Sequence, residues 1–468
     1  MFNLNLKNLF VSDKRFYGTV FRLVLPLVLL NAMSLVLHFC DVFMLGRMGA
    51  ASETAISAAQ IANRPFFLFA MLMFGSMSGA TVLCSQYWGK KDIATINSIA
   101  GVTLIFLLPL CAVFMSVCFF FAEPLMALLS NDPDIVKTAV IYLRIIVFSF
   151  VFNLLTGLFS GILRSVEKVK VPFIAALTGI IINIALNAIL IYGFLGFPAM
   201  GIRGAAIGTV IARIIELAVI LVYIIFYEKT IRFTIKKMLA VKSVIVKDFF
   251  KYGMPVIANE FIWAFGVTVH MYIIGNMDPG INGGDQIAAY TISNLIEQIA
   301  FMSIIGFSTV CCIVIGKAIG EGGDNETVAK YARTFVGLAG FFAFITAGAA
   351  FIFKDAIIAL FEISGATKIY ASQLFTVVTA FILLKTFNCV SIVGIFRGGG
   401  DTKFGMVIDS CFMYFISIPL GFLAAYYFKL SVPFVYAFLV CDELFKFPVV
   451  LRRVKSRRWI RSITREMG

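Results

Sequence analysis

The sequence contains little charge and almost no histidine. Charged residues make up 14% of the 468 residues, whereas hydrophobic residues make up 61%. Soluble domains carry about a quarter of their residues as Asp, Glu, Lys and Arg, so this composition excludes an ordinary soluble protein. The two histidines, His38 and His270, lie in different halves of the chain. A clustered metal or general-base centre is therefore hard to assemble, which argues against a membrane-embedded enzyme.

Motifs for zinc binding, disulfide bonding, secretion and nucleotide binding are also missing. The nine cysteines are scattered, mostly inside apolar runs, without the spacing of a zinc site or a disulfide framework. The first apolar run is too long for a signal peptide and lacks a small-residue cleavage site. FRGGGDTK at 396–403 is rich in glycine but lacks the phosphate-binding pattern that ends in Gly-Lys-Ser/Thr. It predicts a tight turn before a helix, and it gives no support to ATP hydrolysis.

Long apolar runs fill most of the chain. Windows of about 20 apolar residues, the length of a helix that crosses a bilayer, recur throughout. The sequence therefore predicts an all-α integral membrane protein with twelve transmembrane helices, preceded by an interfacial segment at 1–22. The predicted spans are 18–45, 55–84, 93–121, 134–161, 169–195, 201–227, 248–276, 284–316, 327–352, 367–396, 404–428 and 431–453.

The net charge of +14 follows the predicted topology. Most of the 39 Lys and Arg residues fall in segments on the same side of the membrane as the amino terminus. Because cytoplasmic segments carry an excess of Lys and Arg, both termini are expected in the cytoplasm. The basic sixth loop and tail are then features of topology and of attraction to anionic lipid. We expect a multi-pass protein of the plasma membrane that contacts the lipid bilayer and binds no nucleic acid.

The two halves of the chain are related by an internal repeat. LPLVLLNAMSLVLHFCDVFMLGRMG from Leu25 aligns with MPVIANEFIWAFGVTVHMYIIGNMD from Met254, and GILRSVEKVK at 161–170 aligns with GIFRGGGDTK at 394–403. Each half has six predicted helices, and an even number makes the repeat parallel. Two six-helix bundles around a central cleft are typical of transporters. The predicted parts are an N-terminal lobe at 1–228, a basic linker at 229–247, a C-terminal lobe at 248–453 and a basic tail at 454–468.

The chain resembles the multidrug and toxic compound extrusion (MATE) family of the MOP superfamily over essentially its whole length. The resemblance is carried by Pro26, Asp41 and MLGRMG in the first span, SQYWGKKD at 85–92, GIRGAAIGTVIAR at 201–213, and FRGGGDTK. It implies a secondary active efflux transporter, not an enzyme, that antiports organic compounds, above all cationic amphipathic ones, against H⁺ or Na⁺ by alternating access. No cofactor besides the coupling ion is implied, and a monomer is expected. A flippase for a lipid-linked saccharide is the alternative within the superfamily.

Asp41 is an acidic residue inside the first predicted span. An ionised side chain at membrane depth costs about 2.5–3.5 kcal/mol on insertion scales, so it normally faces the protein interior or water. At about 1.5 Å per residue, Asp41, Asn187 and Thr209 lie about 9–10 Å from the outer ends of their spans. Asn183 lies one turn deeper than Asn187 on the same helix face. These four side chains therefore share one layer of the outer leaflet, and we hypothesise that they converge.

If they converge, they offer one carboxylate, two amide oxygens and one hydroxyl, which suits a proton or one monovalent hard cation such as Na⁺. The family resemblance implies the same four positions as the coupling site. Asn187 stands where some members carry a second acid, which lowers the charge of the site by one and leaves H⁺ and Na⁺ both open. The alternative is structural: a packed carboxylate at Asp41, and asparagines that join helices.

The second half carries different polar groups at the repeated positions. His270 aligns with Asp41, and Glu260 aligns with Asn31. Glu260 lies about 16 Å from the start of its span, near the bilayer midplane, so it is a candidate for contacting a cationic substrate or for carrying a second proton. His270 is either a switch that titrates near physiological pH or a satisfied core residue.

Lys385 and Pro26 complete the set of candidate residues. Lys385 lies deep in the tenth predicted span, where a cation needs a partner such as Glu260 or Asp409. It is either part of the substrate site or a member of a buried salt bridge, with a snorkelling side chain as a third possibility. Pro26 breaks the backbone hydrogen bonds of the first helix below Asp41 and is a candidate hinge.

Overall fold

The computed structural model describes residues 10–48, 52–277, 286–359, 361 and 363–465. These residues form helices joined by loops, with no strand among them, as expected for the all-α class. The chain divides into two compact units. The N-terminal unit comprises Leu29–Cys84 and Asp92–Lys251, and the C-terminal unit comprises Met1–Val28, Ser85–Lys91 and Tyr252–Gly468. Two long helices, α2 and α3, are each divided between the units.

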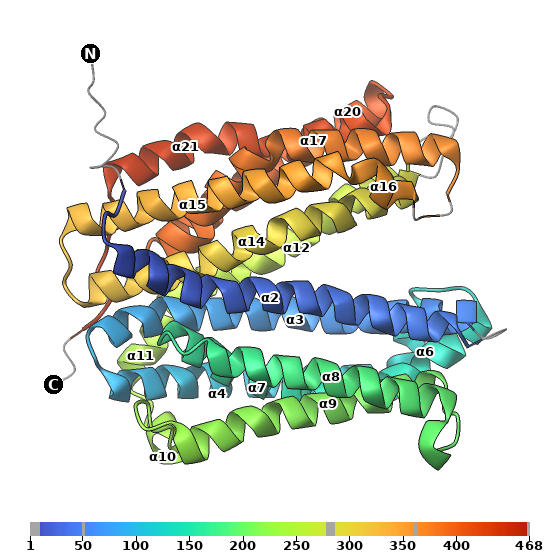
Figure 1. Ribbon diagram of the computed structural model, residues 1–468, viewed down its shortest axis with the longest axis horizontal. Helices are drawn as coiled ribbons and strands as arrows, with labels where there is room; N and C mark the ends of the chain where they lie inside the picture. The colour runs from blue at the N-terminus through green and yellow to red at the C-terminus, as the bar shows by residue number, and fades with distance from the viewer. Residues whose placement is uncertain (1–9, 49–51, 278–285, 360, 362, 466–468) are drawn as a thin grey trace. The chain divides into compact units, whose positions relative to one another are not determined.

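The N-terminal unit is a helical bundle in which α8 and α9 lie side by side (Figure 1). Asp92 and Asp132 cap the first turns of α4 and α6, because their carboxylates accept backbone N–H groups there. Its helices are α2 (Lys14–Gly46) from Leu29 onward, α3 (Ser52–Gly89) up to Cys84, α4 (Ile93–Phe120), α5 (Ala122–Ala127), α6 (Pro133–Ile146), α7 (Ser149–Ser165), α8 (Lys170–Tyr192), α9 (Ile202–Val222) with the π-helical turn η3 (Tyr223–Tyr227), α10 (Ile235–Leu239) and α11 (Ser243–Asp248).

The C-terminal unit is a second bundle, in which α14, α15 and α17 pack on one another (Figure 1). The Asp324 carboxylate and the Ser364 hydroxyl cap α15 and α17, because each accepts a backbone N–H group of the first turn. Besides the ends of α2 and α3, its helices are α12 (Met254–Gly275) after η4 (Phe249–Gly253), α14 (Gln286–Gly320), α15 (Asn325–Ile352), α16 (Lys354–Ala359), α17 (Gly365–Cys389) with η5 (Val390–Phe396), α18 (Thr402–Phe412) with η6 (Met413–Ser417), α19 (Ile418–Phe422) with η7 (Leu423–Tyr427), α20 (Val432–Val440) and α21 (Asp442–Ser456).

The described helices account for most of the predicted membrane spans. Ten helical stretches are long and apolar enough to cross a membrane. An eleventh span arises if α6 and α7, which meet at an angle of 47°, form one broken span over the predicted range 134–161. The chain is therefore a multi-pass membrane protein, and the helix over the predicted range 134–161 is bent between α6 and α7.

The last predicted span, 431–453, is divided at Cys441 into α20 and α21. The second helix has 15 residues and carries Asp442, Glu443 and Lys446 in its first turns, so it does not have the apolar length of a membrane span. The ion pairs described below hold these charges inside the bundle. This explains why an amphipathic segment occupies the place of a continuous apolar helix.

Two segments that were predicted to lie outside the membrane spans contain helices. Residues 14–22 of the predicted interfacial segment are the first turns of the continuous helix α2, while residues 1–9 lie outside the described part of the chain. The predicted linker at 229–247 contains α10 and the start of α11, and α10 packs on α4. A Cβ added at Gly101 of α4 would collide with the carbonyl oxygen of Met238, so the glycine makes this close approach possible.

Candidate functional site

Asp41, Asn183, Asn187 and Thr209 lie together in the N-terminal unit. The side-chain nitrogen of Asn187 donates to Oδ1 of Asp41 at 2.8 Å and lies 3.2 Å from Oδ1 of Asn183. The side-chain nitrogen of Asn183 donates to Oγ1 of Thr209 at 3.1 Å. The Thr209 hydroxyl donates in turn to the carbonyl oxygen of Ala205 at 3.0 Å. The four predicted residues therefore form a continuous chain of hydrogen bonds across α2, α8 and α9.

Glycines of α9 bring this helix close enough to α8 for those hydrogen bonds. A Cβ added at Gly208 would overlap Oδ1 of Asn187, and one added at Gly204 would meet the carbonyl carbon of Leu190 at 2.6 Å. Because glycine has no side chain, two membrane helices can approach closely where it lies in their interface. The GIRGAAIGT segment thus positions the polar side chains of α8 against Thr209.

The hydrogen bond that the Asp41 carboxylate accepts from Asn187 comes from a neutral amide. Arg213, whose charge acts on Asp41 electrostatically, has its own partner, with Nη1 2.6 Å from Oε2 of Glu216. Asn187 is only 1% exposed, and its Oδ1 is buried without a hydrogen-bond partner among the described residues. A buried acceptor oxygen beside a carboxylate can accept a proton donor or coordinate a cation.

Three residues near Asp41 were missed or given no role from the sequence. The Asp41 charge also acts on Tyr142 of α6, whose hydroxyl is hydrogen-bonded to the side chain of Asn63 on α3. Arg213 ends the GIRGAAIGTVIAR segment, and no functional role was expected for its side chain. The available signal for Asn63 was a polar residue inside the apolar second span, but depth alone does not show which way a side chain points on its helix.

Glu260 of α12 is held by a cation in the C-terminal unit. Nη2 of Arg397 lies 2.6 Å from Oε1 of Glu260, and the two side chains are 3% and 12% exposed. The same arginine donates to Oδ1 of Asn259 at 3.1 Å. Arg397 belongs to the FRGGGDTK segment, which the sequence indicated only as a turn. The sequence therefore located Glu260 but missed its counter-ion.

Lys385 of α17 forms an ion pair with Glu297 of α14. The expected partners, Glu260 and Asp409, are wrong, because both of these carboxylates are held by other cations. The hydroxyl of Tyr436 donates to the second Glu297 oxygen at 3.0 Å. The arrangement matches the buried salt bridge that was the alternative for Lys385. The missed signal was Glu297 itself, an acid within the predicted eighth span.

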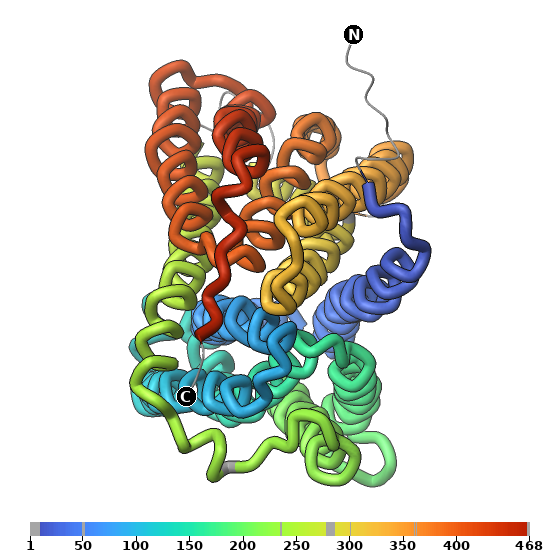
Figure 2. The backbone as a smooth tube through the Cα atoms, turned by 90° about the vertical axis from the view of Figure 1, so that its left-hand side faces the viewer, coloured from blue at the N-terminus to red at the C-terminus, as the bar shows by residue number. Residues whose placement is uncertain are grey.

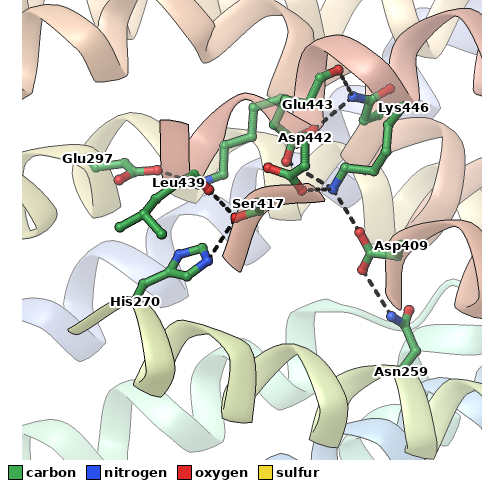
Figure 3. A network of polar contacts seen from close by, with 11 residues as sticks. Asn259, His270, Glu297, Asp409, Ser417, Leu439, Asp442, Glu443 and Lys446 are labelled. Carbon is green, nitrogen blue, oxygen red and sulfur yellow. Dashed lines mark hydrogen bonds and ion pairs between the residues drawn. The ribbon is translucent and has the colours of Figure 1, made fainter. Parts of the chain in front are cut away.

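His270 makes a local hydrogen bond in the interior of the C-terminal unit (Figure 3). The hydroxyl of Ser417 donates its proton to the carbonyl oxygen of Leu439, so it accepts a hydrogen bond from Nε2 of His270 at 2.9 Å. His270 is 8% exposed. This is the geometry of a satisfied core histidine.

Lys446 of α21 forms ion pairs with three carboxylates (Figure 3). Its Nζ lies 3.0 Å from Asp409, 2.8 Å from Asp442 and 3.3 Å from Glu443. Asn259 donates to the second oxygen of Asp409 at 2.9 Å, which connects this cluster to Arg397 and Glu260. Because removal of one partner strands a buried charge, the whole network stabilises the packing of α12, α18 and α21.

Pro26 lies inside α2, which continues as one helix through it. The C-terminal unit includes α2 up to Val28, and the N-terminal unit includes it from Leu29 onward. The predicted hinge residue Pro26 therefore lies close to the point at which α2 passes from the C-terminal unit into the N-terminal unit.

Comparisons with known proteins agree with this architecture. The family model described as MatE matches residues 26–189 and 255–423, one segment in each half of the repeat. The chain is 25% identical over 445 residues to the probable multidrug resistance protein NorM of Thermotoga maritima, covering 94% of this chain and 92% of that one. It is 23% identical over 429 residues to the probable multidrug resistance protein YoeA of Bacillus subtilis, covering 90% of each.

Solved structures share the fold. A structure described as the outward-facing conformation of a multidrug resistance MATE family transporter of the MOP superfamily superposes with a TM-score of 0.82 at 18% identity, covering 94% of this chain and 96% of that one. A MOP superfamily transporter from Pyrococcus furiosus superposes with a TM-score of 0.83 over the same shares. These neighbours have the twelve-helix, two-bundle fold.

Proposed function

Because the chain belongs to the MatE family of membrane transporters, we propose that it exports organic compounds, chiefly cationic amphipathic ones, in exchange for H⁺ or Na⁺. The multidrug resistance names of its relatives support this substrate class. No cofactor is required, and the coupling ion is a transported substrate. The protein acts as a monomer in the plasma membrane with both termini in the cytoplasm.

One observation carries the proposal: Asp41 is a membrane-embedded carboxylate beside a buried, unpartnered amide oxygen. Asn187 donates to Asp41 through its nitrogen and leaves Oδ1 without a partner among the described residues. A carboxylate in this setting has a strong electrostatic reason to take up one positive charge from water. Asn183 and Thr209 continue the chain of hydrogen bonds from Asn187 and supply further oxygen atoms that suit Na⁺ or a proton carried on water.

Exchange follows if the coupling ion and the organic cation prefer different conformations. Loading of Asp41 neutralises the carboxylate and weakens the charge-assisted hydrogen bond that it accepts from Asn187. The α2 helix then rearranges around Pro26, whose missing N–H already breaks the backbone ladder. Each tenfold change in drug affinity requires a difference of about 1.4 kcal/mol in how the ion binds the two conformations. The two lobes that rock are 1–228 and 248–453, joined by the linker at 229–247 and followed by the tail at 454–468.

The C-terminal unit contributes in a different way. Its buried acids are already matched with Arg397, Lys385 and Lys446. Ion coupling is therefore assigned to the N-terminal unit, and Glu260 is the acid at which a substrate cation competes with Arg397. His270 and Lys385 act as packing residues.

The test is transport of ethidium into inverted membrane vesicles under imposed proton or sodium gradients. Asp41→Asn is expected to abolish gradient-driven uptake of ethidium. Asp134→Asn makes the same chemical change at an exposed position in the first turn of α6 and is expected to leave uptake unchanged. Persistence of gradient-coupled uptake in Asp41→Asn would refute the coupling assignment. Uptake by the wild type that is driven by one gradient and not by the other identifies the coupling ion.

A further inference from the structure

The segment 457–465, which follows α21, lies against the C-terminal unit and does not extend away from it. Arg457 ends α21 in the left-handed conformation, with φ 55°. Trp459 is fully buried and Ile463 is 4% exposed, whereas Arg458, Arg461 and the other arginines of the segment are exposed. In Figure 2 the segment is the red trace that leaves α21 and reaches the blue end of α3. Apolar anchors that alternate with exposed residues are the pattern of a peptide docked in a groove.

Gln86, near the end of α3, binds the backbone of this segment with both ends of its amide. Its Oε1 accepts the N–H of Ile463 at 2.9 Å, and its Nε2 donates to the carbonyl oxygen of Arg461 at 3.1 Å. The same Nε2 donates to the carbonyl oxygen of Gly398 at 3.0 Å. Gln86 is fully buried, so displacement of the segment would remove the partner of Oε1 and one of the two acceptors of Nε2.

Two more residues of α3 contact the end of the segment. The N–H of Arg465 donates to the hydroxyl of Tyr87 at 3.2 Å, and Nζ of Lys90 donates to the carbonyl oxygen of Arg465 at 3.1 Å. Together with Gln86, these residues make the end of α3 one wall of the groove.

The FRGGGDTK turn forms the opposite wall. The N–H of Arg461 donates to the carbonyl oxygen of Gly399 at 3.0 Å, and its guanidinium lies 3.1 Å from Asp401. Asp401 is 2% exposed and also binds Arg453 of α21 at 2.7 Å. Because a buried carboxylate needs cationic partners, the turn presents a specific acceptor for an arginine of the segment.

The glycines of the turn make room for the two apolar anchors. A Cβ added at Gly399 would overlap the backbone and ring of Trp459. Gly400 has φ 78°, and a Cβ there would meet Ile463 at 2.7 Å. Phosphate binding is not needed to explain this glycine run, because it provides the seat for the tail.

We propose that residues 457–465 are a clasp that binds the groove between the end of α3 and the 396–401 turn. We further propose that the clasp is released when the transporter opens on the membrane side where this groove lies. The physical reason is chain continuity. Ser85–Lys91 packs in the C-terminal unit, whereas the rest of α3, Ser52–Cys84, belongs to the N-terminal unit. A tail that fastens the end of α3 to the 396–401 turn therefore opposes movement of that helix end away from the turn. The second part of the inference rests on the proposed alternating access.

The docking is tested with full-length protein in nanodiscs that carries a C-terminal affinity tag. Chymotrypsin cleaves after Trp459 when the clasp is released, and loss of the tag reports the rate. Arg461→Ala removes the pair with Asp401 and is expected to speed tag loss about two- to fivefold, the range for a partly exposed ion pair. Arg458→Ala removes the same charge from an exposed side chain and is expected to match the wild type. Gln86→Leu is expected to speed tag loss more than Arg461→Ala.

Ethidium transport by the same variants tests the link to opening. We expect the export rate of Arg461→Ala to change by about twofold or more and that of Arg458→Ala to stay at the wild-type rate. Equal tag loss from Arg461→Ala and Arg458→Ala, or equal export by the two, overturns the clasp. Absence of export by the wild type would count against the proposed function alone, since the cleavage comparison needs no transport.

Discussion

The side-chain amide of Asn187 joins Asp41 to Asn183 in the N-terminal unit. Its nitrogen is 2.8 Å from Oδ1 of Asp41, and its oxygen is buried without a partner among the described residues. An amide that donates with one end and keeps an acceptor without a partner at the other orients the carboxylate and offers an oxygen to a positive charge. We therefore expect Asn187, as well as Asp41, to contribute to the proposed binding of the coupling ion.

Asn187→Ala is expected to weaken binding of the coupling ion by about tenfold, because it removes one oxygen ligand and the donor that orients Asp41. The measurement is the shift in thermal unfolding temperature of purified protein on titration with NaCl at fixed ionic strength, and separately with pH. Asn276→Ala changes an exposed asparagine at the end of α12 and serves as the control. An Asn187→Ala titration that superposes on the wild type would remove Asn187 from the site.

The sequence predicted which residues share a layer but not which residues are partners. Asp41, Asn183, Asn187 and Thr209 could be placed at one depth because helix rise is constant and their spans have recognisable outer ends. The direction of a side chain around its helix depends on packing, which one sequence does not reveal. Tyr142 was missed for that reason, since no charge or break in the apolar pattern marks it.

The buried charges of the C-terminal half show the same limit. Glu260, Lys385 and His270 stood out as polar residues in apolar runs, yet the partners Arg397 and Glu297 lie on other helices. The division of the last predicted span at Cys441 was also hidden, because Asp442, Glu443 and Lys446 look unfavourable in a membrane until Asp409 is placed against them. A hydropathy scale scores each charged side chain as unfavourable in a membrane, whereas in the fold these charges form ion pairs with one another.

Lys385→Ala is expected to lower the free energy of unfolding by about 2–4 kcal/mol, because it leaves Glu297 buried without its cation. Lys385→Met combined with Glu297→Leu is expected to recover most of that loss, since no buried charge remains. Thermal unfolding of the single and double variants gives the coupling between the two sites.

The control for this pair is Lys354→Ala, which breaks an ion pair to the exposed Asp355 and is expected to cost at most about 1 kcal/mol. A substrate role for Lys385 makes a different prediction. In that case Lys385→Ala would reduce ethidium export while the unfolding temperature stayed at the wild-type value.

Arg397→Gln is expected to lower the apparent KM for ethidium by about threefold or more, because it frees the Glu260 carboxylate to attract an organic cation. Glu260→Gln is expected to raise that KM while the response to the coupling ion is kept. Arg144→Gln removes a cation from an exposed position and is the matched control. Initial rates of ethidium export at several concentrations decide the point, and an unchanged KM in both variants would make the pair purely structural.

The acid Glu228, which follows η3, provides a pH-dependent contact outside the membrane spans. Its buried carboxylate is 2.7 Å from Nζ of Lys168 and accepts the backbone N–H groups of Thr230 and Ile231. Burial alone would raise the pKa of Glu228, but the Lys168 ammonium and the two N–H groups outweigh it and lower the pKa below the ordinary value of 4.5. The contact therefore stabilises the fold at neutral pH, and this stabilisation is lost as the pH falls through the lowered pKa.

Glu228→Gln is expected to destabilise the N-terminal unit by about 1–3 kcal/mol at pH 7, because it weakens the hydrogen bonds from Lys168, Thr230 and Ile231 and leaves Lys168 without its counter-ion. The difference from the wild type should shrink as the pH is lowered below 4.5, since the wild-type carboxylate then becomes protonated. Thermal unfolding in detergent at a series of pH values measures both effects, with the exposed Glu321→Gln as control. A neutral amide and a carboxylate differ in charge only above the pKa of the acid. If the difference between Glu228→Gln and the wild type stays constant from pH 7 to well below 4.5, the shape of the Glu228 side chain, and not its charge, holds this loop in place.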